Sequence, residues 1–292
     1  MKILIVMPKI PEGQEYMFPL GIAYVSASLK RAGYEVFTLN LNFYENWREA
    51  LVSCVRDNGI GIAGTGGLSA DYRQLREVFQ AVKEASPETV TVLGGGIVTA
   101  SAHLILDLFP EVDIAMQGEG EESWTALAEA LERGNSLHTV PGLIFREQGA
   151  AVMTERAKDI EPLDSLPYPD YEGFGYQEAM KSMETSGYWI GDRPAFVLSS
   201  RSCPYHCTFC FHTAGNKYRR ASLDHVFGEI DQLIRDYGCR DFNFSDELFG
   251  LKEDYVLEFC ERIRSRNVHW SVSMRVDCIT EAMAKSMSET GC

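Results

Sequence analysis

The sequence predicts an α/β fold, with a doubly wound parallel sheet at the N-terminus and three further βα units from residue 195 onward. Three observations support this fold class. Short apolar runs alternate with segments whose apolar residues recur at helical spacing. Glycine-rich turns follow several of the apolar runs. The length of 292 residues corresponds to about two domains.

The N-terminal part alternates five predicted strands with five predicted helices. Strands are expected at 2–7, 34–39, 60–63, 89–93 and 112–116, and helices at 20–32, 46–56, 71–85, 102–109 and 123–133. Strands joined by crossover helices pair in parallel and have helices on both faces. Residues 1–140 are therefore expected to form one Rossmann-like domain.

Three glycine-rich turns lie where predicted strands end. Ligands bind at the carboxyl edge of such sheets, where glycines let the backbone approach a ligand closely. Strand-to-helix turns also favour glycine without any ligand, so each single turn has a structural explanation. The turns lack G-x-G-x-x-G and P-loop spacing, which gives no reason to expect a dinucleotide or ATP site. The candidate ligand contacts in these turns are Gly66, Gly94, Gly95, Gly118, Glu119 and Gly120.

Residues 141–194 are predicted to separate two domains. Apolar runs on both sides of Gln148-Gly149 predict a small hairpin. Three prolines within residues 162–169 indicate an ordered linker. We therefore expect domains at 1–140 and 195–292, with a hairpin and linker at 141–194.

The alternation of strands and helices resumes at residue 195. Strands are expected at 195–199, 241–244 and 270–274, and helices at 223–237, 254–266 and 281–289. Ser222 or Asp224 is expected to cap the first of these helices. Phe242 and Phe244 should share one face of their strand, because side chains alternate between faces.

The charge balance excludes some classes of partner. Lys and Arg number 27 and Asp and Glu 42, so the formal charge is −15. This argues against non-specific binding to nucleic acid or anionic membranes. The basic run at 217–220 is therefore expected to be a solvated loop or a cofactor contact. Apolar stretches are too short to span a membrane, and no signal peptide is evident, which predicts a cytoplasmic protein.

Three of the eight cysteines form a cluster, Cys203, Cys207 and Cys210, in the spacing C-x3-C-x2-C. Disulfides are uncommon in cytosolic proteins. A structural zinc site needs a fourth ligand, for which His206 and His212 are the local candidates. An iron–sulfur cluster held by three cysteines leaves one iron open for a cofactor or substrate.

This cysteine spacing, in the context Ser199–Tyr205 and with Phe209 before the last cysteine, resembles the radical S-adenosylmethionine (SAM) superfamily. The N-terminal part resembles the cobalamin-binding domain of one branch, which includes class B-like methyltransferases and anaerobic porphyrin ester cyclases. The segments that carry this second resemblance are 18–24 with Pro19, Leu20 and Gly21, the turns at 94–96 and 118–121, and the segments 141–143 and 163–170.

The resemblance implies three cofactors: a 4Fe–4S cluster held by the three cysteines, SAM on the open iron, and cobalamin on the N-terminal sheet. Cobalamin domains of mutases offer a histidine in D-x-H-x-x-G, which is absent here, and His103 lacks that context. The radical SAM branch generally binds cobalamin without a histidine ligand. The alternative is a vestigial or regulatory N-terminal sheet.

Further SAM contacts are expected near the ends of the second and third strands of the barrel. Asp246 and Glu247 are placed by the resemblance near the SAM amino group, or they cap the following helix. Ser273 and Arg275 end the third strand. Arg275 is expected to clamp the SAM carboxylate, or to form an ion pair with Asp277.

The resemblance implies an enzyme that cleaves SAM reductively and methylates an unactivated carbon. Oxidative cyclisation or rearrangement, and a non-catalytic cobalamin or iron–sulfur module, are the alternatives. A small-molecule or natural-product substrate and an electron donor such as flavodoxin or ferredoxin are expected. Radical SAM barrels usually have six or more βα units, so three units predict a partial barrel and a fragment of a longer protein.

Overall fold

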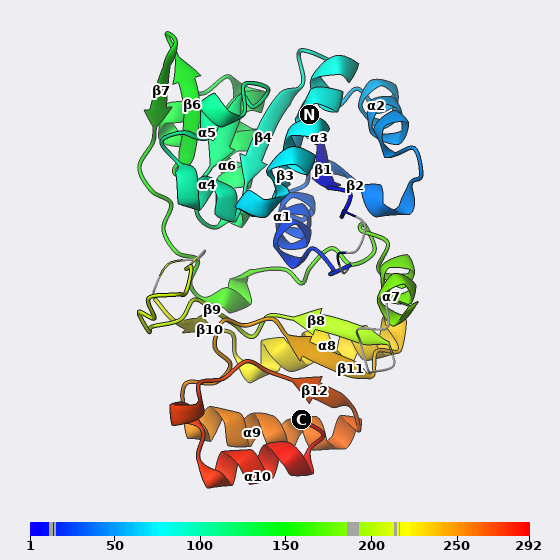
Figure 1. Cartoon of the computed structure of the whole chain (residues 1–292), viewed down its shortest axis with the longest axis vertical. Coiled ribbons are helices and arrows are strands. Elements are labelled where there is room, and N and C mark those ends of the chain that lie inside the picture. The colour runs from blue at the N-terminus through cyan, green and yellow to red at the C-terminus, as the bar shows by residue number, and fades with distance from the viewer. Residues whose placement is uncertain (12–13, 15, 186–192, 213–214, 216) are drawn as a thin grey trace. The chain divides into compact units, whose positions relative to one another are not determined.

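The computed structural model describes all residues except 12–13, 15, 186–192, 213–214 and 216, and it divides into two compact units (Figure 1). The N-terminal unit contains 1–14, 19–159 and 167–176. The C-terminal unit contains 15–18, 160–166 and 177–292. Chain segments therefore cross between the units, whereas the sequence suggested one boundary region at 141–194.

The N-terminal unit is built on a seven-stranded sheet with the order β2-β1-β3-β4-β5-β6-β7. The strands are β1 Lys2–Met7, β2 Glu35–Asn40, β3 Ile62–Gly66, β4 Val90–Gly94, β5 Ile114–Met116, β6 Leu143–Glu147 and β7 Ala150–Met153. The first five are parallel, which confirms the predicted doubly wound sheet. Chain order reverses between β1 and β3, and this is the switch point at which such folds bind ligands.

Helices cover both faces of this sheet (Figure 1). They are α1 Leu20–Arg31, α2 Trp47–Asn58, α3 Tyr72–Ala85, α4 Gly96–Ser101, α5 Ile105–Leu108 and α6 Gly120–Arg133. Buried side chains of α2 to α5 form two apolar clusters against β1, β3, β4 and β5. On the opposite face the indole of Trp124 in α6 lies so close to Gly64 of β3 that a Cβ there would collide with it. The parallel strands are buried on both faces, which explains their continuous apolar sequence.

Two predicted elements of this unit differ in the structure. Of the helix expected at 102–109, only Ile105–Leu108 is helical, as α5; residues 102–104 form a turn, and a short helix that was not expected, α4, precedes them at Gly96–Ser101. Gly95, with a φ of +87°, lets the chain turn sharply so that α4 begins at the next residue. The hairpin expected in the linker extends the sheet, because β6 pairs antiparallel with β5.

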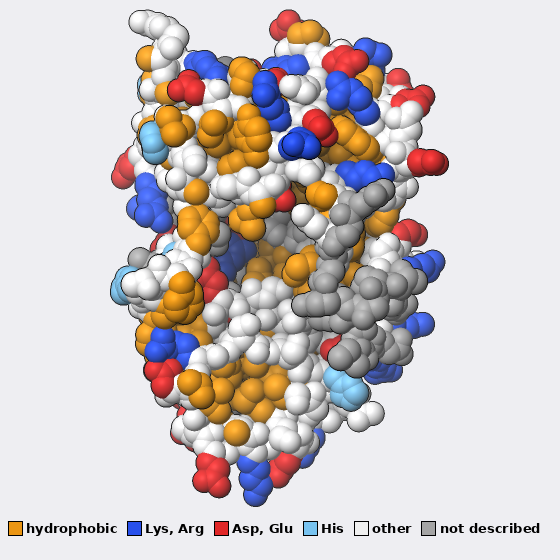
Figure 2. Space-filling view, viewed as in Figure 1, with side chains coloured by type: hydrophobic (Ala, Val, Ile, Leu, Met, Phe, Trp, Pro, Cys, Tyr) orange, Lys and Arg blue, Asp and Glu red, His pale blue; other side chains and the backbone are white. Residues whose placement is uncertain are grey.

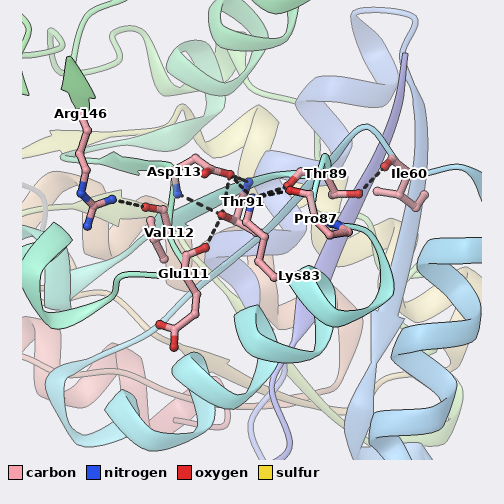
Figure 3. Close-up of polar contacts among 9 residues, drawn as sticks. All are labelled: Ile60, Lys83, Pro87, Thr89, Thr91, Glu111, Val112, Asp113 and Arg146. Carbon is pink, nitrogen blue, oxygen red and sulfur yellow. Dashed lines mark hydrogen bonds and ion pairs between the residues drawn. The ribbon is translucent and has the colours of Figure 1, made fainter. Parts of the chain in front are cut away.

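A polar network ties together the amino ends of β4 and β5, on the edge opposite the glycine-rich turns (Figure 3). Lys83 Nζ donates to the carbonyls of Pro87 (3.2 Å) and Thr89 (2.9 Å) and pairs with Asp113 Oδ2 at 2.6 Å. The same Asp113 oxygen accepts from the Thr91 amide at 2.8 Å. The network thus gives hydrogen-bond partners to the carbonyls of Pro87 and Thr89 and to the amide of Thr91, which lie at or just before the start of β4.

The C-terminal unit contains three parallel strands in the order β12-β11-β8, as predicted. The strands are β8 Pro194–Val197, β11 Asp241–Phe244 and β12 His269–Ser271. The helices are α7 Tyr176–Thr185, α8 Leu223–Tyr237, α9 Glu253–Ile263 and α10 Glu281–Glu289. The first residue of α7, Tyr176, is assigned to the N-terminal unit. The hydroxyl of Ser222 caps α8 by accepting from the His225 amide at 3.1 Å. Helix α7 was not expected, because its segment was assigned to the linker.

Aromatic side chains fill the core of this unit. Phe244 and Trp270, from neighbouring strands, both pack on Phe259 of α9, at centroid distances of 5.3 and 4.9 Å. Phe227 of α8 stacks on the same ring at 5.2 Å. Phe242 and Phe244 are both buried, as their alternation in the strand predicts. This core fixes the strand ends from which the cysteine loop begins.

Two features bear on possible partners. None of the helices in the described part of the chain is both long and apolar enough to cross a membrane. On the face seen in Figure 2, acidic and basic side chains are interspersed and do not gather into one basic surface.

Candidate functional site

The cysteine loop follows β8 and a two-residue strand, β9 Ser200–Arg201, which pairs antiparallel with β10 Arg219–Arg220. Ser202 is buried and has a φ of +66°, a backbone conformation in which the chain turns just before Cys203. The Cys210 amide donates to the Cys207 carbonyl at 3.0 Å, which closes the turn between these two cysteines. Cys203 and Cys207 are half-buried and Cys210 is exposed.

The three thiols are close enough to affect one another. Desolvation, followed by the neighbouring thiols of Cys207 and Cys203, raises the pKa of the Cys210 thiol. Within the described residues, no three His, Cys, Asp or Glu side chains converge as they would around one metal ion. A 4Fe–4S cluster makes a different demand, because each thiolate binds a different iron atom. The loop thus gathers three thiols without forming a single-ion site.

Asp246 is a buried carboxylate that holds the chain just before the cysteine loop. Its Oδ1 accepts from the amides of Ser199 (2.8 Å) and Ser200 (3.0 Å), and its Oδ2 accepts from the Ser199 hydroxyl. Burial raises the pKa of Asp246 to about 6, although these hydrogen bonds act in the opposite direction. The alternative that Asp246 caps a helix is wrong, because α9 begins only at Glu253.

Glu247 lies on the exposed side of the same strand end. Its carboxylate is 3.6 Å from His212 Nδ1, two residues beyond Cys210. It also contributes to the raised pKa of the Cys210 thiol. Of the two acids singled out in the sequence, Glu247 is therefore the one that faces the cysteine loop, and Asp246 is used inside the fold.

Arg275 reaches the cysteine loop from beyond the third strand. Its Nε and Nη2 bind Asp277 at 3.0 and 2.6 Å, which is the ion pair considered from the sequence. Its Nη1 donates to Cys207 Sγ at 3.4 Å, and the guanidinium lies 3.9 Å from the centroid of the Tyr205 ring. The sequence did not predict either contact with the loop, although Tyr205 stands between the first two cysteines.

Two further predicted residues, Ser273 and Phe209, have no side-chain hydrogen bond to the described part of the loop. Ser273 lies past β12, which ends at Ser271 and is shorter than the expected strand, and its carbonyl accepts from the Phe249 amide at 2.9 Å. The Phe209 side chain is 87% exposed.

The basic run at 217–220 is not a solvated loop. Arg219 is 3% exposed and donates to the Ile160 carbonyl at 2.9 Å and to the Ser202 hydroxyl at 3.4 Å. Lys217 is exposed and pairs with Glu161. Alternate residues of a strand point to opposite sides, so Arg219 turns inward and braces the start of the cysteine loop.

The glycine-rich turns of the N-terminal unit have two different roles. A Cβ on Gly95 would lie 2.7 Å from the Gly67 backbone, and one on Gly66 would lie 3.2 Å from Gly94. These two turns therefore pack backbone against backbone, and this packing alone explains Gly66 and Gly95. By contrast, a Cβ on Gly94 would meet nothing closer than 4.0 Å, and one on Gly118 nothing within 4 Å.

The remaining predicted cobalamin contacts lie at helix starts. Pro19 precedes α1, Leu20 is buried in its first turn, and a Cβ on Gly21 would meet only open space. Glu119 precedes α6, and Gly120 packs against Trp124 and Val25. Gly94, Gly118 and Gly21 are thus the predicted contacts that present open backbone.

Comparison with known proteins covers both units. A family model of the B12 binding domain matches residues 12–128. An uncharacterized methyltransferase of Pyrococcus horikoshii is 27% identical over 301 residues, which cover 100% of this chain and 64% of that protein. Anaerobic magnesium-protoporphyrin IX monomethyl ester cyclase of Cereibacter sphaeroides is 28% identical, over 88% of this chain and 42% of its own length.

The resemblance to cobalamin-binding radical SAM proteins is confirmed. The fold agrees with the radical SAM methyltransferase TsrM of Kitasatospora setae, solved with cobalamin and a 4Fe–4S cluster bound. The TM-score is 0.79 at 18% identity, covering 100% of this chain and 57% of TsrM. The chain spans 64% or less of the length of each of these proteins.

Proposed function

We propose that this chain forms the cobalamin- and cluster-binding part of a radical SAM enzyme that methylates an unactivated carbon. The observation that carries the proposal is the loop of Cys203, Cys207 and Cys210, whose thiols gather beside the carboxyl ends of parallel strands. Active sites of β/α barrels lie at that end of the strands. The B12 binding domain in the same chain supports the second cofactor.

The cysteine loop fits a 4Fe–4S cluster. Cys203, Cys207 and Cys210 would supply three thiolate ligands, and none of the three forms a disulfide. When bound there, the cluster supplies the electron that cleaves SAM. The protein's own task is to hold the loop, which Asp246 does through Ser199 and Ser200 and Arg219 does through Ser202.

The glycine-rich edge of the N-terminal sheet fits cobalamin. Gly94 and Gly118 present open backbone at the carboxyl ends of β4 and β5, where a flat ring could approach closely. Leu68, after β3, exposes 53% of its surface at the same edge and offers an apolar contact. When bound there, cobalamin supplies the methyl group for transfer. A small-molecule substrate and a flavodoxin- or ferredoxin-like electron donor complete the proposal.

The first experiment is anaerobic reconstitution with iron, sulfide and hydroxocobalamin, followed by desalting and metal analysis. About four irons and about one cobalt per chain would support both cofactors. Iron without cobalt would keep the radical SAM chemistry and overturn methyl transfer through cobalamin. Absence of iron would overturn the enzyme proposal itself.

Replacement of Cys207 by alanine tests the cluster directly. C207A should lose the cluster's visible absorption and all formation of 5′-deoxyadenosine from SAM, because one of three ligands is gone. The matched control is Cys54→Ala, which removes a free thiol from α2 in the other unit. C54A should keep full iron content. SAM cleavage at the wild-type rate in C207A would contradict the assignment.

Oxidative cyclisation is the second candidate reaction. It is supported by the similarity to the anaerobic ester cyclase, which is of the same order as the similarity to the methyltransferase. Product mass separates the two reactions, because methylation adds one methylene and cyclisation removes hydrogen. A chain that binds both cofactors but never releases 5′-deoxyadenosine would instead be a non-catalytic binding module.

A further inference from the structure

We propose that Arg275 tunes the electron affinity of the cysteine-bound cluster through its hydrogen bond to Cys207, and that Tyr205 and Asp277 hold it in place. This inference rests on the proposed 4Fe–4S cluster. It gives Arg275 a positioning and electrostatic role in place of the SAM-carboxylate clamp expected from the sequence.

The guanidinium of Arg275 is held on three sides. One edge, Nε and Nη2, is occupied by Asp277 Oδ1 and Oδ2 at 3.0 and 2.6 Å. One face lies 3.9 Å from the Tyr205 ring centroid, within the range of a cation–π contact. The remaining nitrogen, Nη1, is 3.4 Å from Cys207 Sγ. The bidentate edge formed by Nε and Nη2 is therefore already used by Asp277.

The backbone around Arg275 is tied to the same loop at a second point. The Tyr205 hydroxyl lies 3.2 Å from Cys278 Sγ. The Cys278 amide in turn donates to the Arg275 carbonyl at 3.0 Å. Residues 275–278 and the loop at 203–207 thus meet through Tyr205–Cys278 and Arg275–Cys207, and these two links fix the distance between the guanidinium and the thiol.

The chemical consequence follows from charge. Reduction of the cluster adds one electron, and part of that charge lies on the cysteine sulfurs. A charged donor to Cys207 stabilises the reduced form and raises the reduction potential. Asp277 opposes this effect, because its carboxylate neutralises the guanidinium and orients it. Removal of Arg275 should therefore lower the potential, and removal of the Asp277 charge should raise it.

The test is an anaerobic redox titration of the reconstituted full chain, followed by electron paramagnetic resonance without SAM. At the wild-type midpoint, Arg275→Met should reduce the ratio of reduced to oxidised cluster about tenfold, equal to about 59 mV for one electron. Asp277→Asn should raise the ratio. The matched control is Arg235→Met, which removes an exposed arginine that pairs with Asp236 on α8. R235M should leave the ratio unchanged.

The outcomes separate this inference from the proposed function. Wild-type protein without iron would overturn the cluster, whereas a wild-type potential in R275M would overturn only the role of Arg275. A wild-type potential together with weakened SAM binding in R275M would return Arg275 to the carboxylate clamp. If R275M fails to hold a cluster, the D277N variant tests the inference instead. An unchanged or lowered ratio of reduced to oxidised cluster in D277N would contradict the role of Arg275.

Discussion

Asp246 shows how one residue supports the cysteine loop from inside the fold. Its oxygens satisfy two consecutive backbone amides, those of Ser199 and Ser200, at the end of β8. Only 4% of the residue is exposed, so water cannot replace these bonds if the side chain is removed. The position of Cys203, four residues after Ser199, therefore depends on a carboxylate almost fifty residues further along the chain.

Removal of the Asp246 side chain should destabilise the C-terminal unit. Asp246→Ala leaves two buried amides without a partner, and each such group costs about 1–3 kcal/mol. Asp246→Asn should cost less, because its amide oxygen can still accept from both. Urea denaturation and hydrogen exchange of β8 and β11 measure the difference. Equal losses in the two variants would show that the amides are not what Asp246 holds.

The same residue predicts a pH dependence. Burial raises the pKa of Asp246 in the folded protein to about 6 from an ordinary 3.8. The folded state therefore retains a proton that the unfolded chain releases, so the free energy of unfolding falls as the pH rises from about 4 to 6. The wild type should show this fall relative to Asp246→Asn in urea midpoints. Parallel pH profiles would contradict it.

At the scale of elements, the carboxyl ends and the amino ends of the strands in the N-terminal sheet carry different kinds of contact. The carboxyl ends carry glycine-rich turns, two of which pack on each other and leave Gly94 open. The amino ends carry the network of Lys83, Thr91 and Asp113 (Figure 3). Hydrogen bonds and an ion pair thus stabilise the amino ends of the strands, whereas the carboxyl ends leave the backbone of Gly94 accessible to a ligand.

Neighbouring glycines should respond differently to substitution. A Cβ on Gly94 would meet nothing closer than 4.0 Å, and Gly94→Val should abolish cobalt retention, because the added methyls occupy the open backbone. Gly95→Ala should destabilise the unit by more than the about 1–3 kcal/mol of a strained backbone alone, because its φ of +87° and ψ of −173° suit only glycine and the added Cβ would lie 2.7 Å from the Gly67 backbone. Cobalt analysis and urea denaturation test these outcomes. Full cobalt content in a folded G94V protein would remove Gly94 from the site.

The network at the amino edge should be a source of stability. Lys83→Met removes two hydrogen bonds to carbonyls and an ion pair, and should lower the free energy of unfolding by about 1–3 kcal/mol. The matched control is Arg133→Met, whose exposed pair with Glu129 is worth about 0.3–0.5 kcal/mol. Urea denaturation compares the two. An equal effect in both variants would show that the network adds nothing beyond surface charge.

At the scale of the whole molecule, each unit supplies its own candidate cofactor ligands. The three cysteines lie in the C-terminal unit, and the open glycines lie in the N-terminal unit. We therefore expect the two cofactors to load independently. Cys207→Ala should retain the wild-type cobalt content, and Gly94→Val should retain the wild-type iron content, as measured by metal analysis after desalting. Loss of both metals in either variant would show that loading is coupled.

The sequence by itself determined the parallel sheet, the three later βα units and the cysteine loop. These features depend on residues that are neighbours in the chain: apolar periodicity, a capping Ser222, and three cysteines within eight residues. Their identification needed no knowledge of what packs against them.

Only the tertiary structure decided what Asp246, Arg219 and Arg275 do. Each meets a partner far along the chain: Ser199, Ile160 and Cys207 respectively. Burial selects which polar groups must be paired, and burial depends on how distant segments pack. A carboxylate or guanidinium looks the same in the sequence whether it faces water, an amide or a thiol, and only packing decides among them.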